Sequence, residues 1–327
     1  MIKKNLETIF IIVFSIAMIL IRLFLPTDAI RTFALAFLSV LFEALPFILI
    51  GSLVSSLLII FATEEKISKI IPKNKYVALA LMSVSGLVFP LCECSIVPIT
   101  KGLIKKKLPL SLGIAFMVGV PIVNPVVFFS TMYAFQSVKI ALTRTLLGIL
   151  SGFVIGLLVD ILQKDRYVLL EDKREHVHDA NEKCSCCHDH SHDKSILSVI
   201  KHTSEEFFNM GKYLIFGAFI SALIKTLVDQ NMILSLGQTQ VISVVAMMVL
   251  AFVLSICSEA DAFIARSFRT SFSMGSIFSF MIFGPMMDIK NLFMMLGSFK
   301  KSFVLKLSAI IVGYNLLLGL ILNFIGV

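Results

Sequence analysis

The apolar residues of this chain are gathered into long runs, and these runs restrict the possible folds more than any other feature. The runs are about 18 to 28 residues long, and a helix needs roughly 20 apolar residues to cross the core of a bilayer. They do not alternate between polar and apolar residues, as the strands of a membrane barrel would. With 57% hydrophobic and 15% charged residues, the chain holds more apolar surface than a soluble core buries. The sequence therefore predicts an all-α polytopic membrane protein.

One hydrophilic region separates the apolar runs into two groups. The predicted apolar segments are 8–25, 32–61, 77–100, 108–135, 138–162, 206–228, 240–264, 272–297 and 302–325. Between them, a charged loop at 163–205 holds all six histidines and three of the six cysteines. We therefore divide the chain into an N-terminal transmembrane helix at 1–31, a first membrane half at 32–162, a His/Cys-rich loop at 163–205 and a second membrane half at 206–327.

The two membrane halves resemble each other, and such repeats affect every later assignment. Three stretches of the first half have counterparts in the second half at separations of 164 to 166 residues: Glu43–Gly51 with Asn209–Gly217, Phe89–Ser95 with Leu254–Asp261, and Gly119–Asn124 with Phe283–Asp288. Because the order is also preserved, we predict one extra helix followed by two pseudo-symmetric repeats with broken or re-entrant helices.

The positions of Lys and Arg predict how the chain is oriented, because cytoplasmic loops carry an excess of both. The lysines at 3–4, 66–75 and 101–107 all predict an inside location. A full span between the last two groups would break this rule. The segment 77–100 contains several Gly and Pro residues, so we predict that it enters the membrane and returns on the same side.

The second half then runs inverted relative to the first. The N-terminus and the His/Cys loop lie in the cytoplasm of a multi-pass plasma-membrane protein. Arg266 and Arg269 would lie outside, which keeps a parallel arrangement of full spans as the alternative. The net charge of +8 is explained by these loops and predicts no nucleic-acid partner.

The strongest chemical signal is the run Pro90-Leu-Cys-Glu-Cys-Ser95, which places one carboxylate and two thiols inside an apolar segment. A charge there costs about 2.5 kcal/mol or more on insertion, so its retention indicates a function. Transporters build midplane sites from such discontinuous helices. The second half supplies Cys257, Glu259 and Asp261 at the corresponding place. The simpler alternatives are thiols that act as small apolar fillers and carboxyl groups with structural hydrogen bonds.

A second signal is a pair of Gly/Pro interruptions, Gly119-Val-Pro-Ile-Val-Asn-Pro125 and Gly284-Pro-Met-Met-Asp288, for which a plain proline kink is the alternative. Glu43 is a further intramembrane carboxylate, but its counterpart is Asn209. The predicted substrate-binding residues are Cys92, Glu93, Cys94, Ser95, Asn124, Cys257, Glu259, Asp261 and Asp288. The predicted helix breaks are Pro90, Pro98, Pro121, Pro125 and Pro285.

The hydrophilic loop offers thiolate and imidazole ligands, which suit zinc or another soft cation. The candidate ligands are Cys184, Cys186, Cys187, His188, His190 and His192. Paired Cys-x-x-Cys knuckles are absent, so a solvated linker with incidental metal affinity is the alternative. No phosphate-binding Gly-rich loop occurs, so we predict no ATP hydrolysis. Apart from the possible metal in the loop, we predict no cofactor.

These motifs carry a resemblance to a known family. The runs at 90–95 and 119–125, with a His/Cys loop between two halves, resemble the predicted permease family that includes ArsP, over about residues 32 to 325. Members characterised under the ArsP name export trivalent organoarsenicals. The resemblance implies a permease more firmly than it implies arsenic.

Thiol chemistry is consistent with such a substrate. A methylated trivalent arsenical has two exchangeable positions that Cys92 and Cys94 can fill, with Cys257 as a third ligand, whereas hard cations prefer oxygen. The second half lacks the complete Cys-Glu-Cys run, which speaks against a symmetric site.

We therefore expect a secondary permease, and not an enzyme, that exports a small thiophilic molecule or metalloid across the bilayer. The rivals are a membrane thiol oxidoreductase, a permease for a sulfur oxyanion or divalent metal, and a metal sensor that uses its membrane part as an anchor.

Overall fold

The computed structural model describes residues 26–61, 71–72, 74–89, 91–163, 168–169, 196–227 and 240–326. Within these ranges the protein is helical, and its only β-type contact is an isolated bridge between Leu169 and Phe299. The first half contains α2 (Thr27–Phe61), α4 (Lys75–Val84), the 3-10 helix η1 (Ser85–Leu87), α5 (Glu93–Lys105), α6 (Leu110–Gly119), α7 (Pro125–Phe135) and α8 (Val138–Leu162). The second half contains α9 (Ile196–Leu227), α11 (Gln240–Leu254), α12 (Asp261–Ser267), α13 (Met274–Met286), α14 (Ile289–Ser298) and α15 (Lys301–Ile325).

Five segments of the described residues are long and apolar enough to cross a membrane: Thr27–Phe61, Val138–Leu162, Ser198–Leu227, Met274–Ser298 and Lys301–Ile325. Large apolar side chains also cover the outside, among them Phe42, Leu305 and Phe324 with exposed fractions of 74% to 90%. Water would penalise such a surface, whereas lipid tails would not. The chain is therefore a multi-pass membrane protein.

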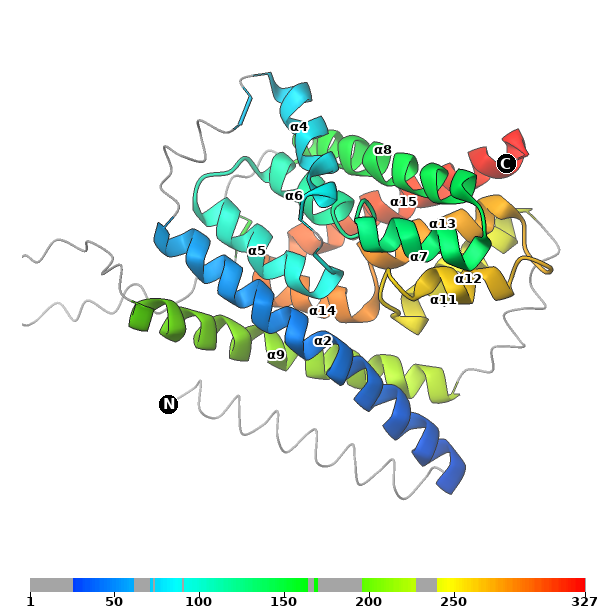
Figure 1. Cartoon of the computed structure of the whole chain (residues 1–327), viewed down its shortest axis with the longest axis horizontal. Helices are drawn as coiled ribbons and strands as arrows, with labels where there is room; N and C mark the ends of the chain where they lie inside the picture. Colours follow the sequence, from blue (N-terminus) through cyan, green and yellow to red (C-terminus); the bar gives the residue numbers. More distant parts are fainter. Residues whose placement is uncertain are drawn as a thin grey trace, which may run out of the picture.

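Each half begins and ends with a long helix, and short helices lie between them. The long helices α8, α9 and α15 run roughly along the longest axis of the molecule, and α2 runs obliquely to it (Figure 1). The remaining helices are short and follow one another in pairs, α4 with α5, α6 with α7, α11 with α12, and α13 with α14. A break in the α-helix separates the two members of each pair, so each of these breaks is flanked by helix ends.

The interruptions have local causes in the sequence. Asn124 caps α7 by accepting a hydrogen bond from the Val126 amide at 2.9 Å, and Pro125 fills the first helical position. Asp288 caps α14 in the same way through the Asn291 amide at 2.6 Å. A new helix therefore starts after Asn124 and after Asp288. This places helix ends inside the fold.

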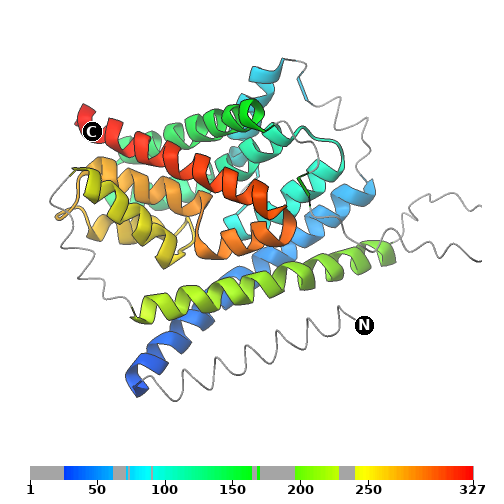
Figure 2. The same cartoon turned by 180° about the vertical axis from the view of Figure 1, so that it is seen from behind.

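The packing divides the molecule into a helix pair and a larger core. α2 and α9 lie side by side along one face, as both views show (Figures 1 and 2). In the core, α4 packs on α6 and α8, while α11 packs on α13 and α15. α6 also packs on α8, and α13 on α15. Two contacts join the halves at the interruptions, α5 with α14 and α7 with α12.

Two of the predicted apolar segments coincide closely with single helices, and the others differ in their bounds or are divided into two helices. α8 covers 138–162 as predicted, and α15 begins one residue earlier than predicted. α9 begins at Ile196, so the last part of the sequence predicted as a hydrophilic loop, residues 196–205, is helical. Val199 and Thr203, four residues apart on one side of this helix, are both buried, and this packing extends the helix into the charged sequence. The predicted helix at 1–31 lies mostly outside the described residues, which begin at residue 26.

The predicted proline breaks differ in where they lie relative to the helices. Pro98 does not break a helix, because it lies inside α5, which runs from Glu93 to Lys105. The chain is interrupted before Cys92 instead, and Pro98 only removes the amide that would bond to the carbonyl of Cys94. Pro90 lies outside the described residues. Pro121 lies in the connection before α7, and Pro285 lies in the last turn of α13, directly before the next interruption.

Candidate functional site

Helix ends from both halves meet in the interior of the protein. α5 and α14 begin at Glu93 and Ile289 and contact each other, and α7 contacts α12, which begins at Asp261. Each start leaves backbone amides without an intrahelical partner and carries a partial positive charge. The predicted site residues lie at these starts, so the fold brings together residues that are far apart in sequence.

The Cys-Glu-Cys run forms the first turn of α5. Cys92 is the N-cap residue, and its carbonyl accepts a hydrogen bond from the Ser95 hydroxyl at 3.0 Å. The Cys92 thiol lies 3.7 Å from the Ser95 hydroxyl and is close enough to the Cys94 thiol to interact with it electrostatically. All four residues of this turn are 1% exposed. The result is a closely spaced, buried pair of thiols at a helix start.

A three-residue ionic cluster lies beside this thiol pair. The Lys290 ammonium donates to the Glu93 carboxylate at 3.0 Å and lies 3.4 Å from the Asp288 carboxylate. All three side chains are 1% to 2% exposed. Burying such charges costs several kcal/mol per ion unless the partners are well placed, so each group depends on the others. This cluster connects α5 of the first half to α14 of the second.

The third membrane thiol has a different neighbour. Cys257 lies in the connection between α11 and α12, is 2% exposed, and interacts electrostatically with Glu43 on α2. It interacts electrostatically with Cys94 at longer range. Among the described residues, no group of three or more His, Cys, Asp or Glu side chains is placed to hold a metal ion. In this conformation, therefore, the three thiols do not form one three-sulfur site.

A second buried ion pair joins the two halves, beside the connection that contains Cys257. The Arg144 guanidinium on α8 donates to the Asp261 carboxylate at 2.6 Å, to the Thr131 hydroxyl at 2.8 Å and to the Met281 carbonyl at 3.0 Å. Arg144 is 1% exposed. Because Arg presents several donors in a fixed plane, it holds α7, α12 and α13 against α8 at once. Asp261 therefore has a structural partner in this conformation.

The remaining predicted residues are placed close to this second pair or act as caps. The Ser130 hydroxyl on α7 donates to the backbone carbonyl of Glu259, and Arg266 donates to the Ala134 carbonyl at 2.8 Å. Glu259 itself is half-buried. Asn124 is used as a helix cap, as described above. The candidate ligands of the His/Cys loop, residues 184–192, lie outside the described residues.

Sequence reasoning missed two central residues, Lys290 and Arg144. Both are basic residues inside predicted apolar segments, at 272–297 and 138–162. An ionisable residue inside a membrane segment is expensive and needs a partner, so the same argument that selected Glu93 could have selected both. Glu43 was noticed in the sequence, and the structure adds its interaction with Cys257.

Comparisons with known proteins agree with this architecture. The family model ArsP_1, described as a predicted permease, matches residues 29–324. "UPF0718 protein YcgR" of Bacillus subtilis is 44% identical over 277 residues, which cover 84% of this chain and 92% of that protein. A Streptococcus mutans protein named "Putative two-component membrane permease complex subunit" is 37% identical over 90% of this chain and 97% of its own length. No solved structure matches. The chain therefore belongs to the ArsP_1 predicted permease family.

Proposed function

We propose that this protein is a secondary permease that exports a small thiophilic solute such as a trivalent organoarsenical. The observation that carries the proposal is the buried pair of thiols, Cys92 and Cys94, at the start of a half-helix in contact with the other half. Each thiol can replace one hydroxyl group of methylarsenite, forming an As–S bond and releasing one water. Soft thiol ligands favour such a solute over hard cations.

The helix pairings support two repeats as the framework for this transport. α4, α6 and α8 pack on one another as α11, α13 and α15 do, and the contact of α5 with α14 corresponds to that of α12 with α7. Gly51 and Gly217, which the sequence repeat aligns, support it too. A Cβ at Gly51 would approach Ser95 to 2.7 Å, and one at Gly217 would approach Lys290 to 2.8 Å. Both glycines therefore let a long helix cross close to a half-helix start.

We further propose that the two halves are inverted, with α4 and α5 forming a re-entrant hairpin. Lys75 at the start of α4 pairs with Asp160 near the end of α8, and Lys101 near the end of α5 pairs with Glu206 in α9. The start of α4 and the end of α5 thus lie at the same end of the molecule (Figure 1). Basic residues at this end support a cytoplasmic location.

Single-cysteine labelling tests this orientation. Lys105 and Ser271 are exposed at connections predicted to lie on opposite sides, whereas Cys92, Cys94 and Cys257 are buried. With the three loop cysteines replaced by Ser, Lys105→Cys is expected to react only with reagent on the cytoplasmic side, and Ser271→Cys only with external reagent. An impermeant maleimide, applied to intact cells and to everted vesicles, gives the measurement. Reaction of both positions from one side would exclude the inverted arrangement.

A solute panel tests the function itself. Cells that lack other arsenical exporters should gain resistance to methylarsenite when they express the protein, and everted vesicles should accumulate it. The same assays should give no signal with thiosulfate, sulfite or divalent metals. Transport of one of those solutes in place of methylarsenite would replace the substrate proposed here.

The closeness of Cys92 and Cys94 also supports a second candidate, a membrane thiol oxidoreductase, because two thiols within reach can form a disulfide. That function would show reversible oxidation of the pair by a quinone, without transport of any solute in the panel.

A further inference from the structure

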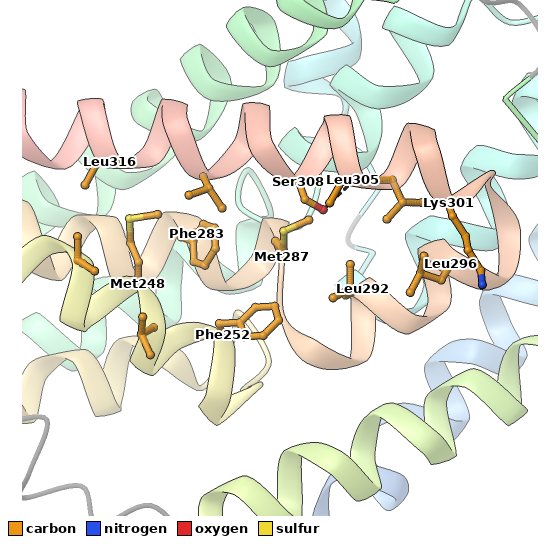
Figure 3. A pocket seen from close by; sticks show the side chains of 14 residues that line it. Met248, Phe252, Phe283, Met287, Leu292, Leu296, Lys301, Leu305, Ser308 and Leu316 are labelled. Atoms are coloured by element: carbon orange, nitrogen blue, oxygen red, sulfur yellow. Dashed lines mark hydrogen bonds between the residues drawn. The ribbon is translucent and has the colours of Figure 1, made fainter.

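An apolar groove runs along α15, on the side that faces α11, α13 and α14. It has a volume of about 660 Å³ and extends from Lys301 at one end to Leu316 at the other (Figure 3). Its walls include Phe252, Met287 and Leu305, and its only charged lining residue is Lys301. The groove follows from the interruption between α13 and α14, where α14 starts again in a new direction and leaves one side of α15 uncovered (Figure 3).

We propose that this α15 groove binds an anionic phospholipid, with one acyl chain in the groove and the phosphate at Lys301. Two of the five membrane-crossing segments, Met274–Ser298 and Lys301–Ile325, form its walls, so lipid hydrocarbon surrounds it. The second polar lining residue, Ser308, donates its hydroxyl to the Val304 carbonyl and presents no free donor to the groove. Between its ends the groove therefore suits hydrocarbon.

The length of the groove suits an acyl chain. Fifteen residues separate Lys301 from Leu316, which corresponds to about 22 Å along a helix. One leaflet contributes roughly half of a hydrocarbon core about 30 Å thick, so one chain reaches from the interface past the middle of the groove.

Charge complementarity selects an anionic headgroup. Lys300, Lys301 and Lys306 are all exposed around the start of α15. Asp288 is the last acidic residue of the sequence, so no carboxylate follows in α14 or α15 to neutralise these lysines locally. The start of a long helix adds a partial positive charge. Each basic residue near a membrane surface attracts anionic lipid by about 1 kcal/mol.

The absence of tryptophan from the sequence makes the test direct, because one introduced Trp is the only indole in the chain. Leu305→Trp places the reporter in the groove, and Leu317→Trp places a control on exposed α15 surface that does not line it. The full-length protein is reconstituted in vesicles that contain brominated phosphatidylglycerol or brominated phosphatidylcholine. We expect brominated phosphatidylglycerol to quench the Leu305→Trp reporter at about fivefold lower mole fraction, which corresponds to about 1 kcal/mol.

A matched pair of lysine variants locates the headgroup. In the Leu305→Trp protein, Lys301→Gln should remove the preference for phosphatidylglycerol, whereas Lys306→Gln, five residues further on and outside the groove, should leave most of it. The control reporter should respond equally to both lipids. Equal quenching of the groove reporter by both lipids, or a preference that survives Lys301→Gln, would overturn the proposal. A reporter that neither lipid quenches, in a protein that sediments as a dimer or with a partner, would assign the groove to protein contact instead.

Discussion

Cys92→Ala and Cys94→Ala are each expected to reduce methylarsenite export by on the order of a hundredfold. This is the upper end of the loss of activity that follows when a metal ligand loses its supporting partner. The reason is that the two thiols lie close to each other and can occupy both exchangeable positions of the solute. One remaining thiol would hold the solute by a single bond. Initial rates of uptake into everted vesicles, normalised to the amount of folded protein, give the measurement.

Two comparisons separate this effect from a general loss of structure. Thr145→Ala removes a hydroxyl, a group similar in size to a thiol, that bonds only within its own helix, α8. This variant should leave export nearly unchanged. Cys257→Ala removes a thiol that lies farther from the other two, so a smaller loss is expected. Full export by folded Cys92→Ala and Cys94→Ala proteins would exclude thiol ligation of the solute.

The sequence predicted the membrane helices well because their signal is local. Run length and composition are sufficient to recognise α8 and α15, whose bounds differ from the prediction by at most one residue. Asn124 and Pro125 also act locally, as a cap and a first helical residue, so the interruption before α7 was visible in the sequence. Pro98 was misjudged because a proline near a helix start loses only one hydrogen bond, and the helix continues through it.

The partners within the candidate site could not be predicted in the same way. Glu93 and Lys290 are 197 residues apart, and Arg144 and Asp261 are 117 residues apart. No periodicity or spacing specifies such pairs, because they depend on how the two halves pack. The sequence could show that each charge inside an apolar segment needs a partner, but only the fold shows which partner it has.

Lys290→Met is expected to destabilise the protein by about 3–5 kcal/mol, because it leaves the Glu93 and Asp288 carboxylates buried without a counter-charge. Thermal unfolding of the purified protein in detergent should show this as a large fall in Tm. The matched control is Lys75→Met, which removes an ion pair with Asp160 whose side chains are 45% and 33% exposed. Exposed pairs contribute only about 0–1 kcal/mol, so this variant should change Tm little. Equal effects of the two variants would contradict a buried ammonium between two carboxylates.

A triple variant separates the structural role of these charges from a role in transport. Combining Lys290→Met with Glu93→Gln and Asp288→Asn removes all three charges together, so no carboxylate is left unpaired, and most of the lost stability should return. Export should nevertheless stay low, because the cluster connects α5 to α14 beside the thiol pair, where we propose that the halves move against each other. If the triple variant exported methylarsenite at the normal rate, these charges would serve stability alone, and the force that couples the two halves would have to lie elsewhere. The Arg144–Asp261 pair, which joins α8 to α12, would then be the next contact to neutralise in the same way.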